Sequence, residues 1–172
     1  SDGTTISNVL NKITYTVDYY YDDVIDSAKQ ENIEVDYKDT VTDYTDKAID
    51  GYVVKNVETL PIVIDSEDIV IKVYYTKRTD LEYTVKYVDS EGNKLQPEKV
   101  VDNQTFGEVV TEQAPDIEGY NKVQTEGTVE ITTGENTITF EYTKRTDLEY
   151  TVNYLEQDTN KVLDTAKTVD GQ

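Results

Sequence analysis

The sequence predicts a mainly β protein built from tandem modules, and three observations carry that prediction. Residues 75–85 recur unchanged at 142–152, an offset of 67 that chance cannot produce. Within 83–88, Tyr and Val alternate with Thr and Lys, and this period of two is typical of strands. The chain contains 15 Tyr, a residue enriched in strands. No segment has ten or more residues with helical periodicity and caps, although a small α content stays open.

The repeat divides the chain into modules of about 67 residues, long enough for a small domain. We predict a diverged module one at 13–80, module two at 81–147, and the opening hairpin of a truncated third module at 148–172. Residues 1–12 are then an N-terminal extension or the end of a preceding segment. Each joint is the polar run Thr-Lys-Arg-Thr-Asp, without a Gly or Ser run. Such short joints predict elongated modules arranged end to end as a rod.

Module two shows its elements in order. After the strand at 83–88, turn chemistry ends in Gly92, which is free to take a positive φ. Residues 109–112 form either a third strand or a short helical turn, because the pattern there fits both. The remaining predicted elements are a return strand at 94–101, a loop at 114–119, a strand at 127–132, a turn at 134–136 and a last strand at 137–142.

The last 25 residues are too few to bury a core of their own. They are expected to be disordered, to pair along the edge of module two, or to pair with another chain. Self-association through strand edges is therefore one expected interaction.

Composition excludes several classes of function. The chain has 36 acidic against 16 basic residues, a net charge of −20, and neither Cys nor His. A disulfide framework, a Cys/His zinc site and a Ser-His-Asp triad are excluded. Binding to nucleic acid or to an anionic membrane surface is not expected from so acidic a chain. No apolar run is long enough for membrane insertion or for a signal peptide. A chain that begins at Ser1 is expected to be a fragment, with its signal and anchor elsewhere.

Several motifs of module two resemble the MucBP (mucin-binding protein) repeat of Gram-positive surface proteins. They are Tyr-Thr-Val-Lys-Tyr-Val-Asp-Ser-Glu-Gly-Asn-Lys-Leu at 83–95, Phe-Gly at 106–107, Ile-Glu-Gly-Tyr at 117–120 and Ile-Thr-Phe-Glu-Tyr at 138–142. Module one departs from this pattern. It has Tyr21-Asp-Asp23 in place of the Asp-x-x-Gly turn and Lys38-Asp39 in place of Phe-Gly.

The resemblance implies a β-grasp-like module, repeated on a secreted adhesin anchored to the bacterial cell wall. It also implies adhesion to host mucin or another glycoprotein as the function. A structural stalk that projects another binding domain is the alternative, and homotypic association is a third hypothesis. One physical objection applies to the mucin-adhesion hypothesis. Mucins carry sialic acid and sulfate, and a chain of this negative charge repels these groups.

Tyrosine rings stack on sugars, so exposed tyrosines are the candidate ligand-binding residues. Most tyrosines, including Tyr15, Tyr83, Tyr142 and Tyr150, occupy alternating apolar positions and are expected to pack in the modules. The run at 19–21 places rings on both faces of one strand, so at least one ring should be exposed. The candidates are Tyr20 from this run, and Tyr52 and Tyr120, which each follow a Gly.

No metal site or other cofactor is predicted, and calcium is the one alternative left open. Its oxygen ligands would be Asp22 and Asp23 near Asp26, or Asp65 and Asp68, although solvated acidic turns explain these runs more simply. Paired carboxylates occur throughout so acidic a chain and therefore do not indicate a glycosidase. No phosphate-binding Gly-rich loop is present. The chain is not expected to be an enzyme.

Overall fold

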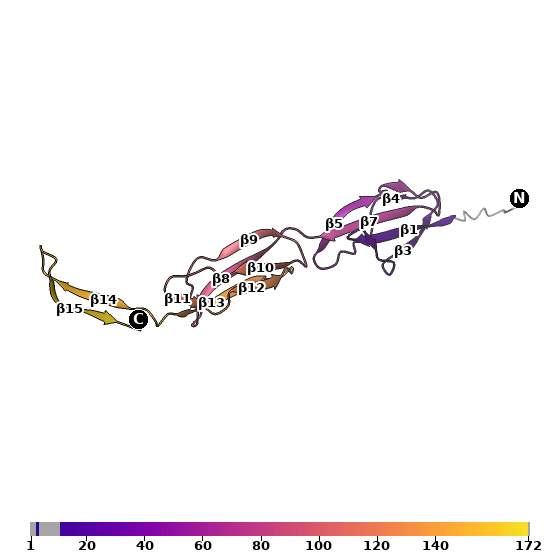
Figure 1. Ribbon diagram of the computed structural model, residues 1–172. Coiled ribbons are helices and arrows are strands. Elements are labelled where there is room, and N and C mark those ends of the chain that lie inside the picture. The colour runs from indigo at the N-terminus through magenta and orange to yellow at the C-terminus, as the bar shows by residue number, and fades with distance from the viewer. Residues whose placement is uncertain (1–2, 4–10, 172) are drawn as a thin grey trace. The chain divides into compact units, whose positions relative to one another are not determined.

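The computed structural model describes Gly3 and residues 11–171, and every element among them is a β-strand (Figure 1). The prediction of a mainly β fold is confirmed, and no described residue forms a helix. The chain forms two compact units. Unit 1 comprises Ser1–Leu81 with Gln104–Gly107, and unit 2 comprises Glu82–Asn103 with Glu108–Gln172.

Unit 1 is built around a parallel pair of strands. β1 (Lys12–Tyr21) runs beside β7 (Val70–Lys77), with Val17 opposite Ile71 and Tyr19 opposite Val73. The sheet order is β2–β1–β7–β5, and β3 also pairs with β1. β4 and β6 form a separate antiparallel pair. The remaining strands of unit 1 are β2 (Val24–Ile25), β3 (Glu31–Asp36), β4 (Thr40–Val41), β5 (Tyr52–Glu58) and β6 (Ile62–Val63).

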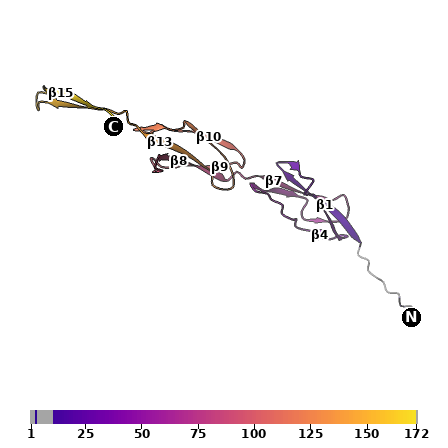
Figure 2. The same ribbon diagram turned by 90° about the horizontal axis from the view of Figure 1, so that it is seen from below.

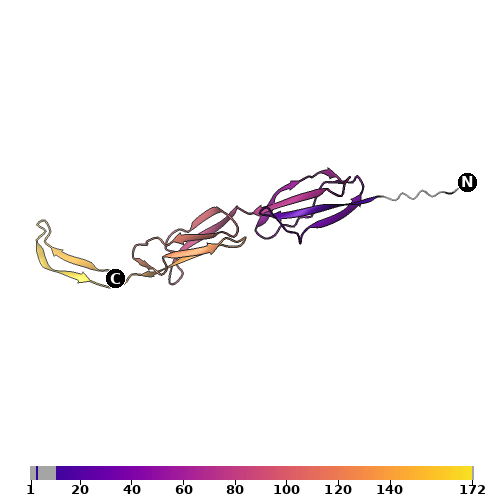
Figure 3. The same cartoon turned by 45° about the vertical axis from the view of Figure 1, so that its right-hand side comes forward.

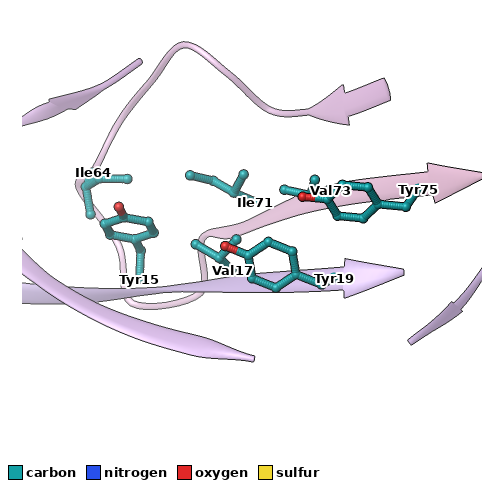
Figure 4. Packing of buried hydrophobic residues seen from close by; sticks show 7 residues of the cluster. All are labelled: Tyr15, Val17, Tyr19, Ile64, Ile71, Val73 and Tyr75. Carbon is teal, nitrogen blue, oxygen red and sulfur yellow. The ribbon is translucent and has the colours of Figure 1, made fainter. Parts of the chain in front are cut away.

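The core of unit 1 follows from the period of two. Alternate residues of β1 and β7 point to the same face of the sheet, where they are buried together with one residue from the loop after β6. Each such side chain contributes about 1.5–3 kcal/mol by its burial. The cluster is Tyr15, Val17, Tyr19, Ile64, Ile71, Val73 and Tyr75 (Figure 4).

Unit 2 repeats this plan. β8 (Leu81–Asp89) runs beside and parallel to β13 (Thr137–Lys144) (Figure 2). Tyr87 lies opposite Phe140, and the order of the sheet is β11–β13–β8–β9. A second, antiparallel sheet contains β10 and β12. The other strands are β9 (Lys99–Gln104), β10 (Val109–Gln113), β11 (Tyr120–Lys122) and β12 (Glu126–Glu130).

Two details of module two can now be settled. The segment that fitted a strand or a helical turn is strand β10. Gly92 has a φ of 84°, as the predicted turn requires. The return strand starts later than predicted, because β9 begins at Lys99 and only an isolated bridge joins Val88 to Lys94 before it.

The C-terminal residues form an antiparallel hairpin of β14 (Tyr150–Leu155) and β15 (Val162–Val169), drawn in orange and yellow (Figure 3). Among the described residues these two strands pair only with each other. The expectations of disorder and of pairing along the edge of module two are therefore wrong. Tyr150, which was expected to pack in a core or across strands, is exposed and belongs to no core. Tyr15, Tyr83 and Tyr142 are buried, as predicted.

Candidate functional site

Tyr20 lies on the face of β1 opposite the core. Its ring stacks on that of Tyr74, its neighbour across the parallel pair, with centroids 4.7 Å apart and planes 19° apart. Both residues are half-buried. The expectation that one ring of the 19–21 run is exposed is wrong, because Tyr19 is buried and Tyr21 is half-buried. Tyr20 and Tyr74 therefore each cover one face of the other's ring, which reduces the ring surface open to a ligand.

Tyr52, at the start of β5, is held by contacts of its hydroxyl and of its ring. Its hydroxyl donates a 2.7 Å hydrogen bond to Oδ2 of Asp22, and its ring meets Tyr21 edge to face at 5.8 Å. The hydrogen bond to Asp22, with burial, raises the pKa of Tyr52. Tyr120 begins β11 in unit 2 and is half-buried. The three tyrosines therefore have separate surroundings, and their role in binding stays a prediction.

Other tyrosine hydroxyls of unit 1 fix the strandless loop around residues 43–48. Tyr19 donates to the carbonyl of Thr45 at 2.9 Å, and Tyr21 donates to the carbonyl of Lys47 at 2.6 Å. Tyr75 donates to Asp46 at 2.7 Å and accepts from the Lys47 amide at 2.7 Å. Burial is the main cause of the raised pKa of both Tyr19 and Tyr75. The tyrosine content of this unit is thus used largely for its internal structure.

An open cavity of about 590 Å³ lies in unit 1 beside Tyr37, at the end of β3. The Tyr37 side chain is 47% exposed, and Nζ of Lys38 lies 5.4 Å from the centre of its ring. The cavity combines this aromatic ring with an amide, a hydroxyl and carboxylates. Its lining consists of Asn11, Lys12, Ile13, Tyr37, Asp65, Ser66, Glu67 and Asp68. We refer to it as the Tyr37 cavity.

Sequence reasoning did not select Tyr37, because it neither follows a glycine nor belongs to the 19–21 run. The alignment of the two modules was also one residue out of register there. The amide of Ile64 donates to the carbonyl of Asp39 at 2.8 Å, and the amide of Ile131 donates to that of Glu108 at 2.8 Å. Asp39 therefore corresponds to Glu108, which places Tyr37-Lys38 at the Phe106-Gly107 position. Lys38 has a φ of 70° and Gly107 a φ of 78°, so both adopt the left-handed conformation. The interpretation of Lys38-Asp39 as the Phe-Gly equivalent is wrong.

The acidic candidates at the β1–β2 turn have local partners. Asp22 accepts the Tyr52 hydroxyl, and Asp23 lies 3.7 Å from Nζ of Lys55. Asp26 lies 2.8 Å from Nζ of Lys29, and this contact is the main cause of its lowered pKa. Each of these carboxylates therefore already has a local partner.

Asp65 and Asp68 line the Tyr37 cavity instead. No group of three or more acidic side chains in the described part of the chain is arranged to hold a metal ion. Calcium binding by any of the four candidate aspartates stays a prediction.

Among residues 3 and 11–171, no helix is present that could cross a membrane.

Residues 83–143 match the family model of the MucBP domain. The match covers most of predicted module two, so the resemblance drawn from its motifs is confirmed there. No protein with a curated description matches the chain.

Seven chains of known structure match, and their superposition scores are too low to add to the argument. A crystal structure of Mub-RV has 18% identity over 77% of this chain and 98% of its own, with a TM-score of 0.31. A type 2 repeat of the mucus binding protein MUB from Lactobacillus reuteri is 17% identical. The match covers 78% of this chain and 100% of the repeat, with a TM-score of 0.29. The third structure contains domains 3–4 of the Streptococcal High Identity Repeats in Tandem (SHIRT) from a cell surface protein, and it is 13% identical. The match covers 78% of this chain and 98% of that structure, with a TM-score of 0.32.

Proposed function

Because residues 83–143 match the MucBP domain, we infer that the chain supplies non-enzymatic adhesion repeats at a bacterial cell surface. The proposed partner is host mucin or a similar glycoprotein. The proposed location is extracellular, on a protein anchored to the cell wall.

The Tyr37 cavity is the observation that favours direct binding of a glycan. The exposed ring of Tyr37 can stack on the apolar face of a sugar, as aromatic side chains do with flat partners. The amide of Asn11, the hydroxyl of Ser66 and the carboxylates of Asp65 and Asp68 can exchange hydrogen bonds with sugar hydroxyls. The Tyr37 cavity is more open and more polar than most small-molecule sites, which suits a hydroxyl-rich sugar better than an apolar ligand.

The negative charge around the Tyr37 cavity determines which kind of glycan can bind there. The whole chain carries −20, and three of the residues that line the cavity are acidic. A sialylated or sulfated sugar would be repelled there, since Lys12 is the only basic residue of the lining. The proposed ligand is therefore a neutral part of a mucin-type glycan.

The first experiment measures binding of the 172-residue chain to immobilised mucin at near-physiological salt. We expect Tyr37→Ala to abolish binding, because it removes the stacking surface. Tyr150→Ala, which removes an exposed ring outside the cavity, is the matched control and is expected to bind normally. Enzymatic removal of sialic acid from the mucin should leave binding unchanged or strengthen it. Absence of binding to either mucin would contradict the proposal.

Further arms of this experiment test the residues predicted from the sequence. Tyr20→Ala, Tyr52→Ala and Tyr120→Ala should leave binding intact if the Tyr37 cavity is the site. The same assay with added calcium and then with chelator tests the four aspartates. Binding that needs calcium would assign them a functional role.

A stalk is the second candidate function, and the joints are the observation that favours it. Arg78 contacts Asp80 through two hydrogen bonds of 2.8 and 3.0 Å, and Arg145 contacts Asp147 through two of 2.9 Å. Each arginine amide also donates to a glycine carbonyl of its own unit, at 2.8 Å to Gly51 and 2.9 Å to Gly119. The joints thus repeat in local structure as well as in sequence. A rigid, extended X-ray scattering profile together with no mucin binding would support the stalk.

A further inference from the structure

A pull between residues 11 and 79 acts on unit 1 through strands β1 and β7, which lie nearest to these two residues in the chain. The two strands run in parallel over six register pairs, which begin with Thr16 opposite Val70. Figure 4 shows both arrows pointing the same way. Because the pair is parallel, the start of β1 and the end of β7 lie at its opposite ends. The pull therefore slides the two strands past each other instead of peeling them apart.

Sliding loads all the backbone hydrogen bonds of the pair at once, since those of a parallel pair are evenly spaced. At one end the amide of Thr16 donates to the carbonyl of Ile69 at 3.1 Å. At the other end the amide of Asp22 donates to the carbonyl of Tyr75, also at 3.1 Å. The buried core residues of β1 and β7 must also pass one another. Because forced unfolding follows the unfolding rate, contacts that break together raise the force that unit 1 withstands.

The tyrosine run at 19–21 adds ring contacts across this pair. Tyr19 and Tyr21 both stack on Tyr75, with centroids 6.5 and 5.1 Å apart, and these contacts lie on the core side. The stack of Tyr20 on Tyr74 lies on the opposite face of the sheet. Every ring of the run therefore contacts a ring of β7, and sliding separates all three contacts.

The outer stack is not needed to build the fold. By the match of the two modules, the positions of Tyr20 and Tyr74 correspond to Val88 and Glu141 in unit 2. These residues also lie opposite each other, in a parallel pair that forms without a ring contact there. The stack in unit 1 therefore strengthens a pair of strands that the fold already forms without it.

We propose that unit 1 bears mechanical load, with the β1–β7 pair as a clamp that resists sliding and the tyrosines of both strands as its reinforcement. An adhesion repeat and a stalk are both under tension when the surface that they hold moves away. The load-bearing role therefore goes beyond either candidate function. It does not depend on a ligand in the Tyr37 cavity.

The test pulls single molecules of the 172-residue chain through two engineered cysteines, since the native chain has none. Handles at Asn11→Cys and Thr79→Cys make β1 and β7 slide. Handles at Asp23→Cys and Thr79→Cys pull on the same pair from one end and peel it open. All three residues are exposed and lie outside the strands.

We expect the rupture force for sliding to be at least about twice that for peeling, because several hydrogen bonds then break together instead of one at a time. Rupture in the sliding geometry should release on the order of 200 Å of extended chain between residues 11 and 79. This length identifies the event as the unfolding of unit 1.

Substitutions separate the clamp from overall stability. Tyr20→Ala removes the stack on Tyr74 and should raise the unfolding rate under sliding load by about two- to tenfold. Val57→Ala is the matched control, because Val57 packs against the same core from β5, which lies outside the loaded pair. We expect Val57→Ala to lower the urea midpoint of unit 1 and to leave the rupture force for sliding unchanged.

Three results would overturn the proposal. Equal rupture forces for sliding and peeling would remove the clamp, and that comparison leaves every strand residue of unit 1 native. An unchanged unfolding rate in Tyr20→Ala would remove the reinforcing role of the tyrosine stack. A fall in the sliding force for Val57→Ala as large as that for Tyr20→Ala would mean that the force follows overall stability instead of the β1–β7 pair.

Discussion

The hydroxyl of Tyr142 donates a 2.7 Å hydrogen bond to the carbonyl of Pro115, 27 residues earlier in the chain. Tyr75, at the matching position of unit 1, makes the same kind of tie to Asp46 and Lys47. Strands β7 and β13 thus each use a buried phenol to hold a loop that has no regular structure. The repeat conserves this tie although the two loops differ in sequence.

Removing this hydroxyl should destabilise unit 2. In Tyr142→Phe the ring keeps its packing, but the carbonyl of Pro115 loses its partner, which costs about 1–2 kcal/mol. The measurement is urea unfolding followed by the NMR signals of unit 2. Tyr150→Phe is the control, because that residue is exposed and should be neutral. Equal stability of Tyr142→Phe and the native chain would show that the hydrogen bond contributes nothing.

Gly127 of β12 should not tolerate a side chain. A Cβ there would lie 2.6 Å from Cγ2 of Ile138 and 3.3 Å from the ring of Phe140, both in the core of unit 2. We expect Gly127→Val to destabilise unit 2 by about 1–3 kcal/mol, the usual cost of overpacking. Gly134→Ala is the matched control, since its nearest neighbour would be 3.7 Å away. The same urea experiment measures both variants, and a neutral Gly127→Val would contradict the packing.

The sequence was sufficient to predict strands where one face is buried. Tyr83 and Val85 alternate with polar residues because one face of β8 meets the core, so the period alone located that strand. The pairing of β8 with β13 could not be read in this way, since parallel partners lie far apart in the chain and no local turn marks them.

The candidate site was harder to predict, for a reason specific to two residues. Tyr37 was overlooked because it neither follows a glycine nor belongs to a run of tyrosines, and its neighbour Lys38 stands where the repeat otherwise has a glycine. A left-handed backbone at a lysine leaves no trace in the sequence, so the aromatic position shifted by one residue in the alignment. The choice of Tyr20 relied on exposure, which its stacking on Tyr74 reduces.

Tyr83 should make the stability of unit 2 fall at alkaline pH. Burial and the 2.6 Å hydrogen bond to Oε1 of Glu112 raise the pKa of Tyr83 to about 12. A free tyrosine titrates near pH 10, so the native state favours the protonated phenol. Its contribution to stability is complete below about pH 10 and is lost as pH rises toward about 12.

The measurement compares urea midpoints of unit 2 in the native chain and in Tyr83→Phe from pH 9 to 12. We expect a shallower decline in Tyr83→Phe, because one proton fewer is linked to unfolding. Tyr150→Phe should follow the native curve. Parallel curves for Tyr83→Phe and the native chain would contradict the assigned role of Tyr83.

Lys38→Gly should stabilise unit 1. Lys38 has a φ of 70°, where a side chain costs about 1–2 kcal/mol, while the corresponding residue of the other repeat is Gly107 with a φ of 78°. Glycine removes that strain but loses about 0.5–1 kcal/mol through the greater freedom of the unfolded chain, so the net gain is at most about 1.5 kcal/mol. The substitution also removes the contact of the Lys38 ammonium with the Tyr37 ring.

Lys38→Ala is the control, since it loses the same contact and keeps the strained backbone. In NMR-detected urea unfolding of unit 1, we expect Lys38→Gly to be the more stable of the two variants. Equal stability would mean that the strain at this position is no larger than the entropic cost of glycine.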